Sequence, residues 1–135
     1  MRRTFQRLAV VAAVASVLVA GIPAAAMAGQ NTFTVTGARV VVNTTAPSTT
    51  RVSVQGTVKD TRADGLCAWV RVIFDFRSGW DRFEDRKACG ADNPAASFSW
   101  TSPSDPWRVY VGACRGDSGW PDYSTCSGGY TFVEL

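Results

Sequence analysis

The fold class is decided by one stretch of the sequence, Ala68-Trp69-Val70-Arg71-Val72-Ile73-Phe74-Asp75-Phe76. Alternate positions place apolar side chains on one face, which carries Ala68, Val70, Val72, Phe74 and Phe76. The opposite face is mixed and carries Trp69, Arg71, Ile73 and Asp75. A period of two in β-branched and aromatic residues predicts a central strand with one fully buried face.

Similar alternation predicts strands on both sides of this stretch. Residues 34–36 lead through Gly37 into residues 39–42, and residues 51–58 place three valines on one side. Further strands are predicted at residues 96–101, 107–114 and 130–135. Residues 43–50 are rich in Thr, Ser and Pro, and they are predicted either as a long connection or as the start of ordered structure.

The predicted strands are separated by turn residues, and no stretch after residue 30 shows sustained helical periodicity. Turn signals occur at Asp64-Gly65, Ser78-Gly79 and Asn93-Pro94, and again at residues 102–106 and 127–129. Short strands with frequent turns predict an all-β fold. We expect a single small antiparallel β-sandwich, Ig-like or similar, of six to seven strands, and a small β-barrel is the alternative.

The N-terminus has the pattern of a signal peptide. Arg2, Arg3 and Arg7 come before an uncharged apolar run at residues 8–20, which is shorter than the roughly 18–20 residues of a spanning helix. Small residues at positions 26 and 28 predict cleavage after Ala28. The domain prediction is therefore a signal peptide at 1–28 and one secreted domain at 29–135. The paired arginines leave the general secretory and twin-arginine routes both open.

Cleavage would change the charge of the chain. The full sequence has 14 basic and 11 acidic residues, and residues 1–28 hold three of the basic ones. The remaining domain has 11 of each and is close to neutral. A nucleic-acid partner normally requires a basic surface, so we expect no nucleic acid as a partner. We also expect no membrane association once the signal peptide is removed.

Four cysteines predict two disulfides in an exported chain. Three pairings of Cys67, Cys89, Cys114 and Cys126 are possible. We favour Cys67–Cys89 and Cys114–Cys126, because each would close one local excursion between strands. A zinc site is the competing interpretation, but the sequence has no histidine and no paired Cys-x-x-Cys motif. No metal and no cofactor is predicted.

Two short motifs overlap at residues 114–121. Cys114-Arg115-Gly116-Asp117-Ser118-Gly119-Trp120-Pro121 is similar to the nucleophile segment of trypsin-like serine proteases. Ser118 would need a base, the sequence has no histidine, and no motif places Lys59 or Lys87 beside it. The same residues contain the integrin-recognised sequence Arg-Gly-Asp-Ser. We interpret them as a polar turn closed by a disulfide.

Carboxylate pairs are the other possible basis for catalysis. Glycosidases need two carboxylates at a fixed separation. No spacing selects a pair from the candidates Asp75, Asp81, Glu84, Asp85, Asp92 and Asp122. The sequence therefore predicts a protein that is not an enzyme.

Part of the chain resembles a group of small secreted, β-rich, disulfide-containing actinobacterial proteins. The resemblance rests on residues 56–68, where a valine-rich strand runs through Asp64-Gly65 into a strand that starts at Cys67. It extends to Lys87-Ala88-Cys89 and to a cysteine-bearing C-terminal hairpin. The resemblance implies export and a β-rich fold, and it implies no particular activity.

Aromatic residues give the remaining clue to function. Trp69, Trp100 and Trp107 fall on predicted strands, where packing is expected. Trp80, Trp120 and Tyr123 lie in Gly-, Asp- and Pro-rich connections, which are expected at the surface. They either plug the ends of the sandwich or face a ligand together with Asp81 and Asp122.

The sequence thus favours a secreted binding or structural module without catalytic activity. Carbohydrate or cell-wall binding through Trp80, Trp120, Tyr123, Asp81 and Asp122 is the leading hypothesis. The alternative is a protein-interaction module or inhibitor that uses residues 115–125. A small hydrolase is the least favoured. The partner would accordingly be a polysaccharide or an extracellular protein.

Overall fold

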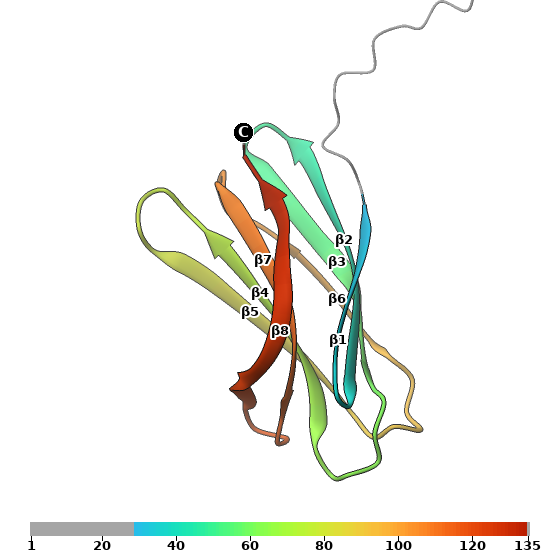
Figure 1. Cartoon of the computed structure of the whole chain (residues 1–135). Helices are drawn as coiled ribbons and strands as arrows, with labels where there is room; N and C mark the ends of the chain where they lie inside the picture. The colour runs from blue at the N-terminus through green and yellow to red at the C-terminus, as the bar shows by residue number, and fades with distance from the viewer. Residues whose placement is uncertain (1–28, 135) are drawn as a thin grey trace, which may run out of the picture.

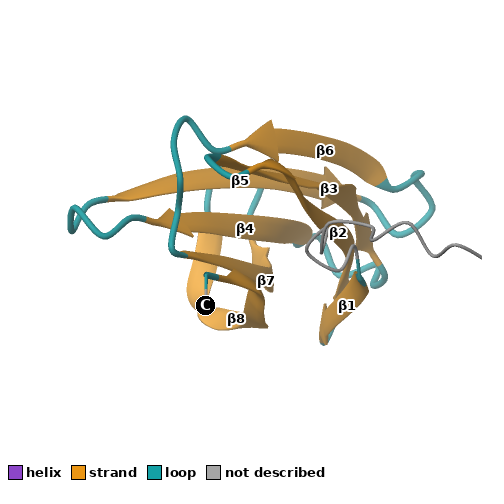
Figure 2. Ribbon diagram, turned by 90° about the horizontal axis from the view of Figure 1, so that it is seen from above, coloured by secondary structure: helices purple, strands orange, loops and turns teal. Residues whose placement is uncertain are grey.

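The computed structural model describes residues 29–134, which form strands and no helix (Figures 1 and 2). The predicted signal peptide and Leu135 lie outside the described residues. The strands are β1 (Gln30–Val35), β2 (Ala38–Ser48), β3 (Arg51–Asp60), β4 (Cys67–Asp75), β5 (Asp81–Cys89), β6 (Ala96–Thr101), β7 (Arg108–Gly116) and β8 (Pro121–Val133). Within residues 29–134 there is accordingly no helix of the length and hydropathy needed to cross a membrane.

Two four-stranded antiparallel sheets make up a β-sandwich, as predicted. Sheet A has the order β1-β2-β3-β6, and sheet B has the order β5-β4-β7-β8. Contacts between the sheets run from β1 to β8, from β2 to β7, from β3 to β4 and from β6 to β5. Every described connection lies at one of the two ends of the sandwich. The lower end in Figure 1 holds the β1–β2, β3–β4, β5–β6 and β7–β8 connections.

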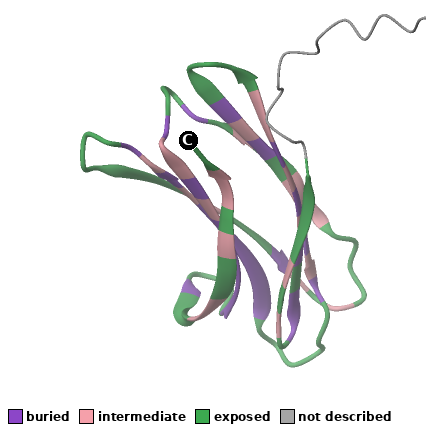
Figure 3. Cartoon of the chain, turned by 45° about the horizontal axis from the view of Figure 1, so that its top comes forward, coloured by how far each residue is buried: buried purple, intermediate pink, exposed green. Residues whose placement is uncertain are grey.

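The core is built from the inward positions of both sheets, seen as buried bands along the strands in Figure 3. Sheet A contributes four valines that are fully buried, Val40, Val42, Val54 and Val58. Sheet B contributes the face predicted from residues 68–76, in which all five apolar side chains are buried. Aligned sheets whose inner side chains interdigitate are the usual solution for a two-sheet core.

The structure has eight strands, where the sequence patterns predicted six to seven, and two of the predicted strands are longer than expected. β5 was not predicted at all, β8 starts nine residues before the predicted residue 130, and β2 continues through Ser48. β5 is an edge strand, and its exposed charges include Arg82, Arg86 and Lys87. Charged edge strands resist pairing with other chains, and such a strand lacks the apolar alternation that identifies a central one.

Both disulfides have the favoured pairing. Cys67–Cys89 links directly opposite residues of β4 and β5, and Cys114–Cys126 links β7 to β8. The two bridges pack around the Trp69 side chain, which is buried even though it lies on the outer side of sheet B. Two structural disulfides fit an oxidising, extracellular setting.

A buried ion pair connects the two sheets at the lower end. Arg115 on β7 donates from Nη1 to the Asp60 carboxylate at 3.0 Å and to the Gly37 carbonyl at 2.7 Å, and from Nη2 to the Asp64 carboxylate. Asp60, only 1% exposed, also accepts hydrogen bonds from the amides of Gly90 and Arg62. Arg115 and Asp60 therefore fix the β1–β2, β3–β4 and β5–β6 connections to the end of β7.

Gly37 is required at this point. Its φ is +85°, and a Cβ there would lie 2.6 Å from the Arg115 guanidinium carbon. Only glycine satisfies both the left-handed backbone and the close approach of the arginine. The β1–β2 turn is thus fitted to the ion pair that it covers.

We expect Asp60→Ala to destabilise the domain by about 3–5 kcal/mol, because it leaves the Arg115 charge buried with part of its pairing removed. Urea unfolding followed by circular dichroism measures this change. Asp92→Ala removes an exposed carboxylate from the same end, and it should change the stability by no more than about 0.5 kcal/mol. Equal stability of the two variants would contradict the role given to Asp60.

Candidate functional site

The outer side of sheet B, called here the sheet B face, brings aromatic and charged side chains together. Strand pairing arranges most of them in three rows across the sheet, and a further row below these holds Lys87, Trp69 and Cys114. The upper row has Asp81, Asp75 and Arg108, the middle row has Phe83, Ile73, Tyr110 and Tyr130, and the lower row has Asp85, Arg71, Gly112 and Gly128. The mixed face predicted for residues 68–76 therefore runs through the centre of this surface.

Arg108 is held flat between two aromatic rings. Its Nε and Nη2 donate to Asp75 Oδ2 at 3.0 and 2.6 Å. The guanidinium carbon lies 3.7 Å from the Trp107 ring centroid and 4.9 Å from that of Tyr130. Stacking and charge-assisted hydrogen bonds together fix the side chain in one orientation.

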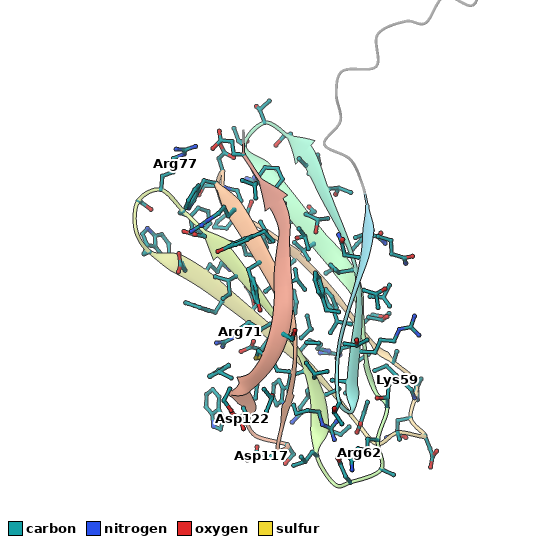
Figure 4. All side chains as sticks on the ribbon, viewed as in Figure 1. Lys59, Arg62, Arg71, Arg77, Asp117 and Asp122 are labelled. Carbon is teal, nitrogen blue, oxygen red and sulfur yellow. A yellow bond between two sulfur atoms is a disulfide. The ribbon has the colours of Figure 1, made fainter. Side chains whose placement is uncertain are left out.

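Arg71 forms a second stack of the same kind, about midway between the two ends of the molecule (Figure 4). Asp85 accepts from Nε and Nη2 at 2.8 and 2.7 Å in a bidentate pair. The guanidinium carbon lies 3.8 Å from the Tyr123 centroid and 5.1 Å from that of Phe83, and Nη2 also donates to the Tyr123 hydroxyl at 2.7 Å. The sheet B face thus has two rigid, arginine-centred aromatic stacks.

A bulge in β8 brings Tyr123 to this position. Asp122 pairs with Arg115 and Ser127 pairs with Ala113, so residues 123–126 lie opposite Cys114 alone. Extra residues in one strand bend it and redirect its side chains. Tyr123 consequently reaches from β8 to Arg71 on β4.

A depression of about 330 Å³ lies at the Arg108 stack and is lined by Ile73, Asp75, Asp81, Arg108, Tyr110 and Tyr130. The rings of Tyr110 and Tyr130 meet edge to face, with centroids 5.9 Å apart. Tyr130 is 55% exposed, and Phe83 on the opposite edge of the sheet is 52% exposed. Exposed aromatic rings around a depression with polar groups form the usual composition of a ligand site.

The two carboxylates that line the depression, Asp75 and Asp81, influence each other's pKa. Burial and the neighbouring charge of Asp75 raise the pKa of Asp81. Burial also opposes ionisation of Asp75, but hydrogen bonds from the side chains of Trp107 and Arg108 outweigh it and lower the pKa of Asp75. Asp75 is therefore the ionised partner of Arg108, and Asp81 is the more easily protonated member of the pair.

The structure places the residues predicted from sequence in two groups. Asp81 and Tyr123 belong to the sheet B face. Trp80 is in the β4–β5 connection at the upper end, against the ring of Phe76, and Trp120 and Asp122 are at the lower end of β8. Trp80 is 65% exposed and Trp120 74% exposed, so neither plugs an end of the sandwich.

Asp122 and Asp117 stabilise local turns. Asp122 Oδ1 accepts from the amide and hydroxyl of Ser124. Asp117 Oδ1 accepts from the amides of Trp120 and Gly119, and these bonds lower the pKa of Asp117. Because the Arg115 side chain is buried beside Asp60, the Arg-Gly-Asp-Ser sequence does not present its arginine to solvent.

Sequence reasoning missed Tyr130, Phe83, Tyr110, Arg71 and Arg108 as site residues. One signal for them was present, since the outward positions of the predicted strand at 68–76 alternate apolar with charged residues instead of being uniformly polar. Among residues 29–134, no group of three or more Cys, Asp or Glu side chains is placed to hold a metal ion.

Comparisons of the chain with protein-family models, with curated proteins and with solved structures find no match. The function must therefore be inferred from the chemistry of the sheet B face.

The two carboxylates allow a direct test of the depression. Since its pKa in the folded protein is raised, ionisation of Asp81 destabilises the fold as the pH rises through that pKa. Asp75→Asn removes the neighbouring charge and frees Arg108, so the pKa of Asp81 should fall. Carbon-13 NMR titration of the carboxyl groups measures it. The pKa of Asp117, in the distant turn, should stay unchanged, and an unchanged Asp81 would contradict the described pairing.

Proposed function

We propose that this protein is a secreted, non-catalytic module that binds an uncharged polysaccharide on the sheet B face. The observation that carries the proposal is a depression that contains Asp75, Asp81 and Arg108 and is lined by the exposed ring of Tyr130, with the exposed ring of Phe83 in the same row, opposite the lining residue Ile73. Pyranose rings have apolar faces and a rim of hydroxyl groups. The sheet B face offers a matching surface for both.

Aromatic rings and fixed polar groups have separate tasks in such a site. Tyr130 and Phe83 provide flat apolar area that loses little conformational freedom on binding. Asp75 and Arg108 provide acceptors and donors for hydroxyl groups, and their mutual ion pair already holds them in place. A preorganised site avoids part of the entropy cost of ordering side chains when the ligand binds.

The charge balance of the face favours a neutral ligand. Arg71 is paired with Asp85, and Arg108 is paired with Asp75. The remaining charges on the face are Lys87 and Asp81, which have opposite signs. Polyanions such as nucleic acids need a net positive surface, which this arrangement does not offer.

The indications that the protein is exported support the same proposal. The signal-peptide pattern at residues 1–28 and the two disulfides both indicate export. An exported domain meets polysaccharides of cell walls and of the surroundings. Binding to them needs no catalytic group.

Affinity electrophoresis in gels that contain neutral soluble polysaccharides (glucans, xylans or mannans) tests the proposal. We expect at least one of them to retard the wild-type protein, and Tyr130→Ala and Phe83→Ala to weaken the binding by about tenfold or more. Trp120→Ala removes an exposed ring from the lower end and serves as the matched aromatic control. It should bind as the wild type does.

Two results would overturn the proposal. In the first, no neutral polysaccharide retards the wild-type protein. In the second, Trp120→Ala abolishes the retardation and Tyr130→Ala does not, which would move the site to the β7–β8 turn.

A further inference from the structure

We propose that the sheet B face binds an internal stretch of a linear polysaccharide chain, which lies along the strands from Tyr123 towards Trp107. This inference rests on the proposed function and specifies the ligand as an extended chain, in place of a single terminal sugar. It follows from the distance between the rows that hold Arg71 and Arg108 and from the aromatic surface between these rows.

The rows that hold Arg71 and Arg108 are too far apart for one sugar ring. Arg71 and Asp75, the β4 residues of these rows, are four positions apart, which corresponds to about 13 Å along a strand. The middle row lies between them, and it holds Phe83 of the lower stack and Tyr130 of the upper stack. Aromatic surface is thus offered at three successive levels along the strand direction.

The Tyr110 ring lies over Gly112, between the lower stack and the depression on the β7–β8 side of the sheet. The lower row has Gly112 on β7 and Gly128 on β8 at this point. A Cβ on Gly128 would lie 2.0 Å from the Val111 carbonyl oxygen, and one on Gly112 would lie 3.0 Å from the Tyr110 ring. The packing therefore requires residues without side chains at Gly112 and Gly128, and it lets the Tyr110 ring lie against the sheet as part of the aromatic surface near Tyr130.

The depression adjoins a second one at Asp75. This second depression, of about 450 Å³, is lined by Asp75, Phe76, Arg77, Gly79 and Trp107, and it shares Asp75 with the first. A chain that crosses the first depression can therefore continue along the second. A surface that continues past the first depression accepts the interior of a chain as well as its end.

Such an arrangement makes affinity depend on chain length. A sugar unit held at the depression places its linked neighbours at a high effective concentration near Tyr123. Each further sugar unit that contacts the sheet B face then increases the affinity, because a linked unit does not pay the full entropy cost of a separate binding event. Affinity should rise with the number of units until the chain covers both stacks.

The test is isothermal titration calorimetry with a series of oligosaccharides, from the monosaccharide to about the hexasaccharide, prepared from the polysaccharide that retards the protein. We expect affinity to rise by about tenfold or more across the series and then level off. Tyr123→Ala should weaken binding of the longest oligosaccharide and leave that of the shortest binding one unchanged. Tyr130→Ala should weaken both, and Gln55→Ala on the outer side of sheet A should weaken neither.

A second measurement covers the case in which Tyr123→Ala does not fold. In NMR titrations of the wild-type protein, the signals of Tyr123 and Arg71 should move with the longest oligosaccharide and not with the shortest. Equal affinity along the series, or shifts of Tyr123 with the shortest ligand, would overturn this inference and leave polysaccharide binding intact. Failure of every polysaccharide to bind would instead overturn the proposed function.

Discussion

The ion pair between Arg115 and Asp60 is the constraint on which the lower half of the structure depends. Two charges removed from water must satisfy one another and their remaining hydrogen-bond positions, or the cost of burial is not recovered. Here the partners come from the ends of β3 and β7 and from the turn at Gly37. Because these elements belong to different sheets, the two layers can close only in the register that brings all of these groups together.

Three arginines of sheet B have different structural roles because their surroundings differ. Arg115 points into the protein and has lost almost all contact with water, whereas Arg71 and Arg108 lie on the outer side, each between aromatic rings and beside one carboxylate. The outer pairs keep part of their surface in water, so screening limits what they contribute to stability. Their main effect is to keep the rings of Tyr123, Tyr130 and Trp107 in defined positions.

Periodicity predicted the strands that have a clear apolar face, and it failed where both faces of a strand are polar. Residues 68–76 and Ala96–Thr101 were predicted correctly, and the cysteine pairing followed from local spacing. β5 was missed because an edge strand keeps its charges in water on both sides. The candidate site was predicted only in part: loop composition pointed to Tyr123 and Asp81, but Tyr130 and Phe83 join them through strand register, which no local pattern contains.

The position of the disulfides has a mechanical consequence. Both bridges join neighbouring strands of sheet B, and within residues 29–134 no disulfide connects one sheet with the other, so that only the β3–β4, β5–β6 and β6–β7 connections of the main chain do. A force that pulls the layers apart acts on packing and on non-covalent contacts such as those of Arg115 and the hydrogen bond between Thr44 and Thr131. A force that shears β5 from β4, or β8 from β7, acts on a covalent bond. The sandwich therefore yields first between its layers, and the strands that carry the aromatic surface remain tethered in pairs.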